Sequence, residues 1–277
     1  MAFVESGTLR LWAERIGDPG DPPVLLISGS MAQAINWPEA FVDRLVEGGR
    51  QVIRYDHRDT GQSDTVDFDA KPYTVADLGW DAIAVLDGFG IRAAHLVGAS
   101  MGGVLAQGIA SLQPERVLTL TAMNTTPISG GADLPPPDPA FLRALDEAGQ
   151  LPKDTAEQRV EVDLLNYAAM NGTELPYDRD LARDLAERYF ARAKDWTKAA
   201  NHLRAGGEEP DHLPAITAPT LVIGATADPL LPLPHSEAVA AGIPGARLVT
   251  VPGMGHHMYS PGLPERLADL VLEHTKA

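Results

Sequence analysis

The chain has 277 residues, 44% of them hydrophobic, no cysteine and a formal net charge of −16. That length suits one large α/β domain or one domain with an insertion. The absence of cysteine excludes disulfides, thiolate metal sites and a cysteine nucleophile. Because so acidic a chain repels phosphate backbones and anionic lipid surfaces, we expect neither nucleic acid nor a membrane as a partner.

No targeting or spanning segment stands out in the sequence. The first seven residues, MAFVESG, do not form a basic region followed by an apolar stretch, so we expect no signal peptide. Apolar runs stay well below the ~18 residues of a membrane span. We find neither an internal repeat nor a heptad pattern. We therefore expect a cytoplasmic protein, and the sequence leaves both a monomer and a homodimer open.

Short apolar segments alternate with helical patterns through the first 125 residues. Residues 1–16 alternate apolar and polar side chains, which predicts a strand or a hairpin. The next strands are predicted at the apolar runs 24–27, 51–55, 94–97 and 117–123. Helical patterns lie between these runs, at 38–48, 74–88 and about 101–113. Thr74 and Asp77 have the spacing of a capping box at the start of one helix.

The alternation stops at about Asn124. Residues 127–140 are rich in proline and glycine, and only helical patterns follow up to residue 206. The helices predicted in this part of the chain are 140–148, 158–171, 179–194 and 196–205. Strands and helices alternate again at the end of the chain, with strands at 220–224 and 247–251 and helices at 234–242 and 264–275.

These patterns predict an α/β fold with an inserted helical cap. The core would comprise residues 1–126 and 213–277, with a mostly parallel sheet of eight strands and helices on both faces. We call residues 127–212 the cap segment. An insertion just past the carboxyl edge of a sheet can cover a site there as a lid. The alternative is a separate helical domain with a structural role; a lid is favoured because both ends of the cap segment return to the same sheet.

The stretch 94–104 combines an apolar strand, a sharp turn and a helix. Its centre, Gly98-Ala99-Ser100-Met101-Gly102, has the Gly-x-Ser-x-Gly spacing of a nucleophile elbow. A serine on so tight a turn needs small neighbours, which the glycines and Ala99 provide. The turn exposes the hydroxyl and sets its backbone near the positive end of the following helix. Taken alone, the motif could also be a turn without chemistry.

A serine hydroxyl needs a base, and the base needs an orienting acid. Asp228 and His256 follow Ser100 in the chain order serine, acid, histidine. Each lies just past the end of a predicted strand, on the edge that carries Ser100. His257 is the alternative base, but His256 directly follows the Gly-x-Gly turn that leads off the last strand. We predict Ser100, Asp228 and His256 as a catalytic triad.

The pattern disfavours the alternatives to Asp228 as the orienting acid. Some folds of this kind place it after the strand that follows the elbow helix, but that position holds Met123-Asn124. Asp211 lies in the linker after the cap helices, not at a strand end. The other histidines are interpreted as surface or structural and lack metal-ligand spacing: His57, His95, His202, His212, His235 and His274. We predict no metal site.

Attack on an acyl carbon creates an oxyanion that needs two backbone N–H donors. We expect one from Met101, the residue after the nucleophile, and one from Ser30, in the loop after the strand 24–27. Met31 is the less favoured alternative to Ser30. Gly29 allows the backbone to come close to the nucleophile. Residues 56–63, rich in Asp, Arg and Gly, are interpreted mainly as a scaffold at the sheet edge.

Apolar and aromatic side chains of the cap segment are candidates for the substrate pocket. Each of them alone is more often a core residue than a pocket residue. Tyr189 and Phe190 belong to this apolar set of the cap segment. The residues predicted to contact substrate are Met31, Tyr167, Met170, Trp196 and His257.

The motifs as a set resemble the α/β-hydrolase superfamily over residues 1–125 and 215–277. The motifs that carry the resemblance are Asp56-His57-Arg58-Asp59-Thr60-Gly61-Gln62-Ser63, Gly98-Ala99-Ser100-Met101-Gly102-Gly103, Asp228-Pro229 and Pro252-Gly253-Met254-Gly255-His256. Within the superfamily the chain is similar to the aclacinomycin methylesterases, which demethylate anthracycline polyketides. That similarity rests on Ile53-Arg54, Tyr55 to Gly61, Trp37-Pro38 and Ala84-Val85-Leu86-Asp87-Gly88.

The resemblance implies the α/β-hydrolase fold, the triad named above, and Ser30 and Met101 as oxyanion donors. The oxyanion loop departs from the superfamily, which often has His-Gly where this chain has Ser28-Gly29. The methylesterase group also lacks that histidine. The sequence of the cap segment does not visibly match that of the methylesterase group.

Together the motifs predict a cofactor-free carboxylic ester hydrolase that forms an acyl-enzyme. We expect a small apolar ester as substrate, such as a methyl ester of an aromatic polyketide-like compound. The alternatives use the same triad on a C–C bond, a lactone or a peracid, and a ligand-binding receptor on this fold is less favoured. Ser100 excludes the epoxide hydrolases and haloalkane dehalogenases of this fold, which attack with an aspartate.

Overall fold

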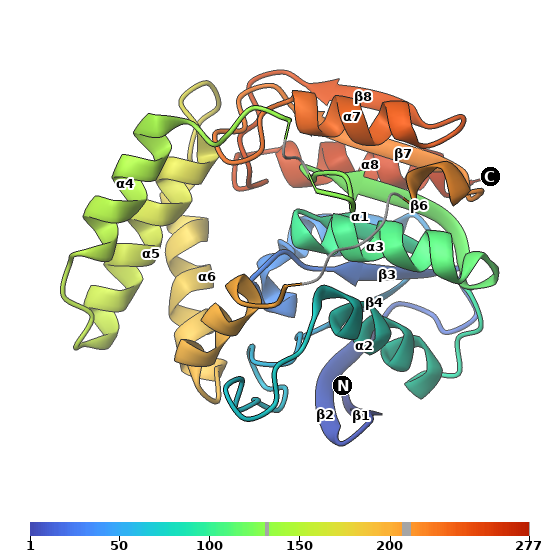
Figure 1. The fold of residues 1–277 in the computed structure, drawn as a ribbon, viewed down its shortest axis with the longest axis horizontal. Helices are drawn as coiled ribbons and strands as arrows, with labels where there is room; N and C mark the ends of the chain where they lie inside the picture. Colours follow the sequence, from blue (N-terminus) through green and yellow to red (C-terminus); the bar gives the residue numbers. More distant parts are fainter. Residues whose placement is uncertain (131–132, 207–211, 277) are drawn as a thin grey trace.

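One mixed sheet organises the protein (Figure 1). The structure is a computed structural model, and it describes residues 1–130, 133–206 and 212–276. Among these residues, eight strands pair in the order β1-β2-β4-β3-β5-β6-β7-β8. The strands are β1 (Ala2–Ser6), β2 (Leu9–Ile16), β3 (Pro23–Ile27), β4 (Gln51–Tyr55), β5 (Ala94–Ala99), β6 (Val117–Met123), β7 (Thr220–Ala225) and β8 (Arg247–Val251).

The sheet is parallel from β4 to β8. The hairpin β1–β2 joins β4 by antiparallel pairing, so residues 1–16 form the hairpin that the alternating pattern allows. All later pairs are parallel. The predicted fold, a mostly parallel eight-stranded sheet with helices on both faces, is therefore confirmed.

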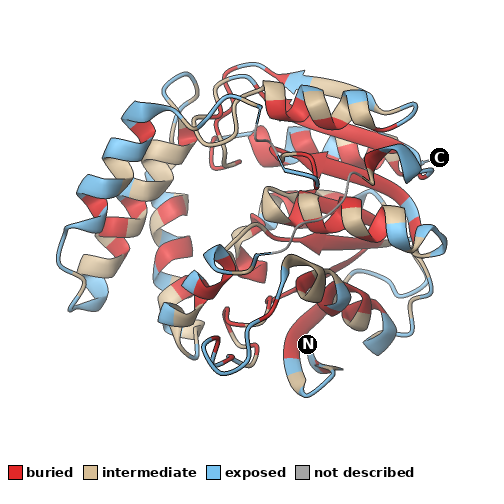
Figure 2. Ribbon diagram, in the orientation of Figure 1, coloured by how far each residue is buried: buried red, intermediate tan, exposed pale blue. Residues whose placement is uncertain are grey.

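Alternate side chains of the strands pack against helices on opposite faces. The helices of the core are α1 (Glu39–Glu47), α2 (Val75–Gly88), α3 (Met101–Leu112), α7 (Pro234–Gly242) and α8 (Leu263–His274). On β3, Val24 and Leu26 point to the face covered by α1 and α8, whereas Leu25 and Ile27 point to the face covered by α2, α3 and α7. Figure 1 shows α2, α3 and α7 in front of the sheet, and Figure 2 shows its central strands buried. Strands buried on both faces explain why their sequences are apolar runs.

Local capping signals set some of the helix ends. The Thr74 hydroxyl accepts a hydrogen bond from the Asp77 N–H, and the Asp77 carboxylate accepts one from the Thr74 N–H. The capping box predicted at the start of α2 is thus confirmed. Short 3₁₀ helices, η1 (Ala34–Asn36) and η2 (Pro114–Arg116), complete the core connections. None of the helices in the described ranges has the length and apolar character that a membrane crossing requires.

The cap segment lies between β6 and β7. Its described elements are α4 (Pro139–Gly149), α5 (Ala156–Asn171), α6 (Arg179–Arg192) and η3 (Trp196–Leu203). η4 (Leu213–Ala215) follows the cap segment and leads to β7. The helix expected at 196–205 is a 3₁₀ helix, and the other three match their predicted ranges closely. Figure 1 shows α4, α5 and α6 grouped to one side of the sheet, and Figure 2 shows exposed residues along α4 and α5.

Several hydrogen bonds tie the cap segment to loops at the carboxyl ends of the parallel strands. The Met170 carbonyl accepts a bond from His256 N–H, past β8. Arg192 donates to Asp56, just past β4, at 2.8 Å. The cap segment therefore meets the edge at which ligand sites of parallel sheets form.

We expect Leu26→Ala to lower the free energy of unfolding by about 2–5 kcal/mol, because Leu26 is completely buried and its removal leaves a cavity. The matched control is Leu112→Ala on α3, whose side chain is 55% exposed and should change stability by less than about 0.5 kcal/mol. Denaturant unfolding followed by circular dichroism measures both. Equal losses from the two substitutions would contradict this packing.

Candidate active site

Ser100 stands on a strained turn between β5 and α3. Its φ of 55° and ψ of −123° lie outside the regions that a non-glycine residue normally adopts. Such a conformation costs about 1–3 kcal/mol and persists only where the surroundings fix it. Two hydrogen bonds do so: Ser100 N–H donates to the Met123 carbonyl at 2.9 Å, and Thr125 Oγ1 donates to the Ser100 carbonyl at 2.7 Å.

The glycines around Ser100 are required by close backbone contacts. A methyl group on Gly98 would overlap the Gly102 carbonyl, and one on Gly102 would overlap the Ile27 carbonyl. At Gly103 it would press against Thr125. These close contacts between strands and helix explain why the motif needs small residues around Ser100.

His256 and Asp228 form a hydrogen-bonded pair. His256 Nδ1 lies 2.7 Å from Asp228 Oδ2, and both side chains are almost fully buried. The other carboxylate oxygen accepts from the N–H groups of Leu230 and Leu231, each at 2.9 Å. Because a carboxylate only accepts, Nδ1 carries the proton, and the Nε2 lone pair of the neutral ring is left free to act as a base.

The loop that carries His256 is held from two sides. His256 N–H donates to the Met170 carbonyl of α5 at 2.7 Å. Asn124 Nδ2 donates to the carbonyls of Gly255 and His256 at 3.2 and 3.1 Å. Asn124 follows Met123, which already accepts from Ser100. One strand end, that of β6, therefore links the nucleophile turn to the histidine loop.

The structure brings the three predicted triad residues to one edge of the sheet. Ser100 follows β5, Asp228 follows β7 and His256 follows β8. The sheet order β5-β6-β7-β8 makes these strands near neighbours. Asp211, the alternative acid, lies outside the described residues.

His257 packs in an aromatic cluster, and it is His256 that binds Asp228. Its ring stacks on Tyr259 with centroids 4.8 Å apart and an interplanar angle of 12°. Tyr167 contacts it edge-on at 5.4 Å. Burial lowers the pKa of His257 to about 3, so the ring is neutral at physiological pH. Its Nε2 is buried and has no hydrogen-bond partner within the described part of the chain.

The loop after β3 runs beside the nucleophile. A methyl group on Gly29 would come within 3.2 Å of Ser100 Cβ. Met31 N–H already donates to His202 Nδ1 at 2.9 Å, which favours Ser30 N–H as the free donor. On the other side, Met101 N–H is in the first turn of α3, where N–H groups have no partner within the helix. These positions fit the two donors predicted from the sequence.

The predicted substrate-contact residues lie in different surroundings. Met31 is 38% exposed in the loop after β3, and Tyr167 touches His257. Met170 binds the His256 loop through its carbonyl. Trp196 packs edge-on against Phe190 and beneath the Arg159 guanidinium, inside the cap segment. Tyr167, Met170 and His257 thus lie beside the His256 loop, Met31 lies two residues past Gly29, and Trp196 packs within the cap segment.

The segment 56–63 acts as a brace at the sheet edge. The Asp56 carboxylate is fully buried and accepts from Ala34 N–H, Gln62 N–H and Arg192. Asp59 accepts from Val66 N–H, the Tyr73 hydroxyl and Asn201. This fits the scaffold role expected of the segment.

Five of the remaining histidines, His274 among them, have hydrogen-bond partners. Four of them are buried and hydrogen-bonded: His57, His95, His202 and His235. Within the described ranges no group of His, Asp and Glu side chains is arranged to hold a metal ion. The sequence did not identify His202 or Asn124 as site residues and offered Tyr189 only as a pocket candidate, because their partners lie up to 171 residues away.

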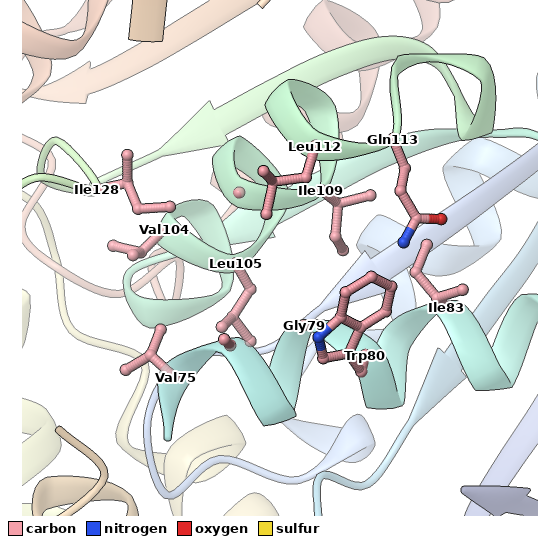
Figure 3. A pocket seen from close by; sticks show the side chains of 12 residues that line it. Val75, Gly79, Trp80, Ile83, Val104, Leu105, Ile109, Leu112, Gln113 and Ile128 are labelled. Carbon is pink, nitrogen blue, oxygen red and sulfur yellow. The ribbon is translucent and has the colours of Figure 1, made fainter. Parts of the chain in front are cut away.

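An apolar hollow between α2 and α3 is separate from this site (Figure 3). Its volume is about 40 Å³, far below the ~300–1,000 Å³ of pockets that hold small molecules. None of the residues that line it is titratable. The side chains seen in Figure 3 include Val75, Trp80, Ile83, Leu105, Ile109 and Leu112. It lacks the groups that acyl chemistry requires.

Comparison with known proteins agrees with the fold. A family profile described as alpha/beta hydrolase fold matches residues 22–263. The chain is 38% identical to the rhodomycin D methylesterase DnrP of Streptomyces peucetius, over 99% of this chain and 98% of that protein. It is 30% identical to a putative carbamate hydrolase, RutD, of Variovorax paradoxus over 86% of each. A crystal structure of a hydrolase from Pseudomonas aeruginosa superposes with a TM-score of 0.74 at 26% identity, covering 100% of this chain and 98% of that one.

We expect Gly98→Ala to lower the free energy of unfolding by about 1–3 kcal/mol or more, because the added methyl group meets backbone that cannot rotate away. Gly149→Ala at the end of α4 is the control, since a methyl group there meets nothing within 4 Å. It should be neutral or slightly stabilising in a helix. Thermal unfolding compares the two, and an unaffected Gly98→Ala variant would refute the close approach.

Proposed function

The chain belongs to the α/β-hydrolase family, and from that premise we propose that it is a carboxylic ester hydrolase with Ser100 as its nucleophile. The observation that carries the proposal is the 2.7 Å hydrogen bond between His256 and Asp228 at the edge where Ser100 stands on its strained turn. A serine, a histidine with a free Nε2 and a buried orienting carboxylate are the three groups that acyl transfer requires.

The reaction proceeds in two halves. Ser100 Oγ attacks the acyl carbon while His256 Nε2 takes its proton, and the protonated ring then delivers that proton to the leaving alcohol. Water, deprotonated by the same Nε2, attacks the acyl-enzyme and releases the acid. Asp228 keeps the ring in the required tautomer and stabilises its charged form through the bond to Nδ1. Every group used belongs to the chain or to water.

Backbone N–H groups of Ser30 and Met101 stabilise the oxyanion in this proposal. Met101 supplies a donor at the positive end of α3. A methyl group on Gly29 would come within 3.2 Å of Ser100 Cβ, so the loop after β3 lies close enough to the nucleophile for Ser30 N–H to serve as the second donor. Removing one such donor in a serine hydrolase costs about 10²–10³-fold in kcat.

The substrate class that we propose is a methyl ester on an apolar or aromatic scaffold. The similarity to a methylesterase is higher and covers more of the chain than the similarity to a carbamate hydrolase. Tyr167, His257 and Tyr259 form an aromatic cluster beside His256, suited to a flat apolar group. In this proposal the cap segment serves as a lid over a core of residues 1–126 and 213–277.

We expect a fluorophosphonate to label the wild-type protein on Ser100, with the adduct mapped by mass spectrometry. Ser100→Ala should lose both labelling and ester hydrolysis while its midpoint of thermal unfolding stays the same. A panel of aryl methyl esters, short-chain acyl esters and lactones should show fastest turnover on the methyl esters. Labelling at another residue, or substantial hydrolysis by Ser100→Ala, would overturn the nucleophile assignment.

We expect His256→Ala to reduce kcat by at least about 10³-fold, because no other group can accept the Ser100 proton. His257→Ala is the matched neighbour and should cost far less, since His257 is neutral and packs on Tyr259. Steady-state kinetics on the same ester compares them. The reverse ranking would exchange the two roles.

A further inference from the structure

We propose that His202, in η3 of the cap segment, is a positioning residue that holds the oxyanion loop in its active shape. The inference rests on the proposed function and extends it to a residue outside the triad. His202 reaches the loop after β3 across 171 residues of sequence, and its Nδ1 lies 2.9 Å from Met31 N.

The loop needs holding because its turn contains a strained residue. Ala32 N–H donates to the Gly29 carbonyl at 3.3 Å, so Ser30 and Met31 are the central residues of a β-turn. Met31, and not Ser30, has a positive φ, at 63°. A positive φ at the third position alone defines a type II turn, which favours glycine or asparagine there. Methionine does not favour this backbone conformation, so contacts from the surroundings must hold it there.

Rotation of the Ser30–Met31 peptide would relieve that strain. The rotation converts a type II turn into a type I turn, in which the third residue takes a negative φ and most residues are accepted. It would turn the Met31 N–H away from its present direction. The hydrogen bond from this N–H to His202 therefore opposes the one movement that relaxes Met31. The Ser30–Met31 peptide directly follows the Gly29–Ser30 peptide, whose N–H is the proposed oxyanion donor.

The protonation state of His202 suits an acceptor. Its Nε2 lies 2.9 Å from the Arg58 carbonyl, which only accepts, so Nε2 carries the proton and Nδ1 is free to accept from Met31. Burial lowers the pKa of His202 to about 4, which keeps the ring neutral at physiological pH. The ring also contacts His57 edge-on at 5.6 Å. His57 in turn donates to the Ser28 carbonyl, at the start of the same loop.

A second bond from the cap segment holds the other side of Met31. The Tyr189 hydroxyl, on α6, donates to the Met31 carbonyl at 3.0 Å. The N–H and the carbonyl of the strained residue are thus both held by side chains of the cap segment. The cap segment accordingly shapes the catalytic loop as well as covering the edge.

Two isosteric substitutions of His202 separate its two hydrogen bonds. Glutamine places its amide near the position of Nε2, so His202→Gln keeps the donor to Arg58 and loses the acceptor for Met31. Asparagine places its amide oxygen near Nδ1, so His202→Asn keeps the acceptor and loses the donor. We expect His202→Gln to lower kcat by about 10- to 100-fold, less than the loss of an oxyanion donor itself, with KM within about twofold. His202→Asn should recover most of that loss.

A transition-state analogue reports on the oxyanion loop directly. An aryl trifluoromethyl ketone adds to the serine and forms an oxyanion, so its inhibition constant should rise in His202→Gln in proportion to the fall in kcat/KM. His202→Asn should bind it nearly as tightly as wild type. Thermal unfolding of both variants shows whether either loss comes from lower stability.

The outcomes are distinct. Equal losses in His202→Gln and His202→Asn, or an inhibition constant that does not follow kcat/KM, would refute the positioning role and leave the triad in place. Should His202→Gln fail to fold, His202→Ala with His202→Asn as its control makes the same comparison, and equal kcat values for these two variants would refute the role as well. Wild-type protein that neither hydrolyses esters nor takes a fluorophosphonate would refute the proposed function itself, and the inference with it.

Discussion

The left-handed backbone of Ser100 is the constraint on which the rest of this edge depends. Around this serine, with its φ of 55°, α3 approaches β5 and β3 so closely that Gly98 and Gly102 admit no side chain. The N–H and carbonyl groups of Ser100 form hydrogen bonds with Met123 and Thr125, at the end of β6. The next residue of that strand end, Asn124, binds the His256 loop. The strain at Ser100, the proposed nucleophile, is therefore held by the same segment that places His256, the proposed base.

A second strained residue, Met31, completes this edge in the same manner. Ser100 and Met31 both have positive φ, and each is held by hydrogen bonds to its own N–H and carbonyl. The difference lies in where the partners come from. The core alone holds Ser100, whereas the cap segment holds Met31. Residues forced into sparsely populated backbone conformations gather where function needs a fixed geometry, and here they come from two different parts of the chain.

Much of the core and the positions of the triad candidates could be predicted from the sequence, because their signals are local. Apolar runs, the capping box at Thr74 and Gly98, which meets the Gly102 carbonyl, each reflect contacts within a few residues or one strand–helix unit. The holding of Met31 by His202 could not be predicted, because a histidine in a helical pattern carries no mark of a partner 171 residues away. The roles of Asn124 and Tyr189 were hidden for the same reason. Tertiary hydrogen bonds of this kind depend on how the cap segment docks, which periodicity does not encode.

In the proposed role of the cap segment as a lid, the hydrogen bonds of α6 and η3 limit how it can open to admit a substrate. Moving α6 away from the core would break the bond from Tyr189 to Met31 and remove Arg192 from the fully buried Asp56. A buried hydrogen bond contributes about 0.5–1.5 kcal/mol net, and stripping the partner from a buried charge costs about 3–5 kcal/mol. α4 packs on α5 and takes no part in these bonds, so its displacement leaves the oxyanion loop intact. Because the catalytic loop is shaped by α6 and η3, the physically cheaper opening is one in which these two elements stay docked and the α4 side moves.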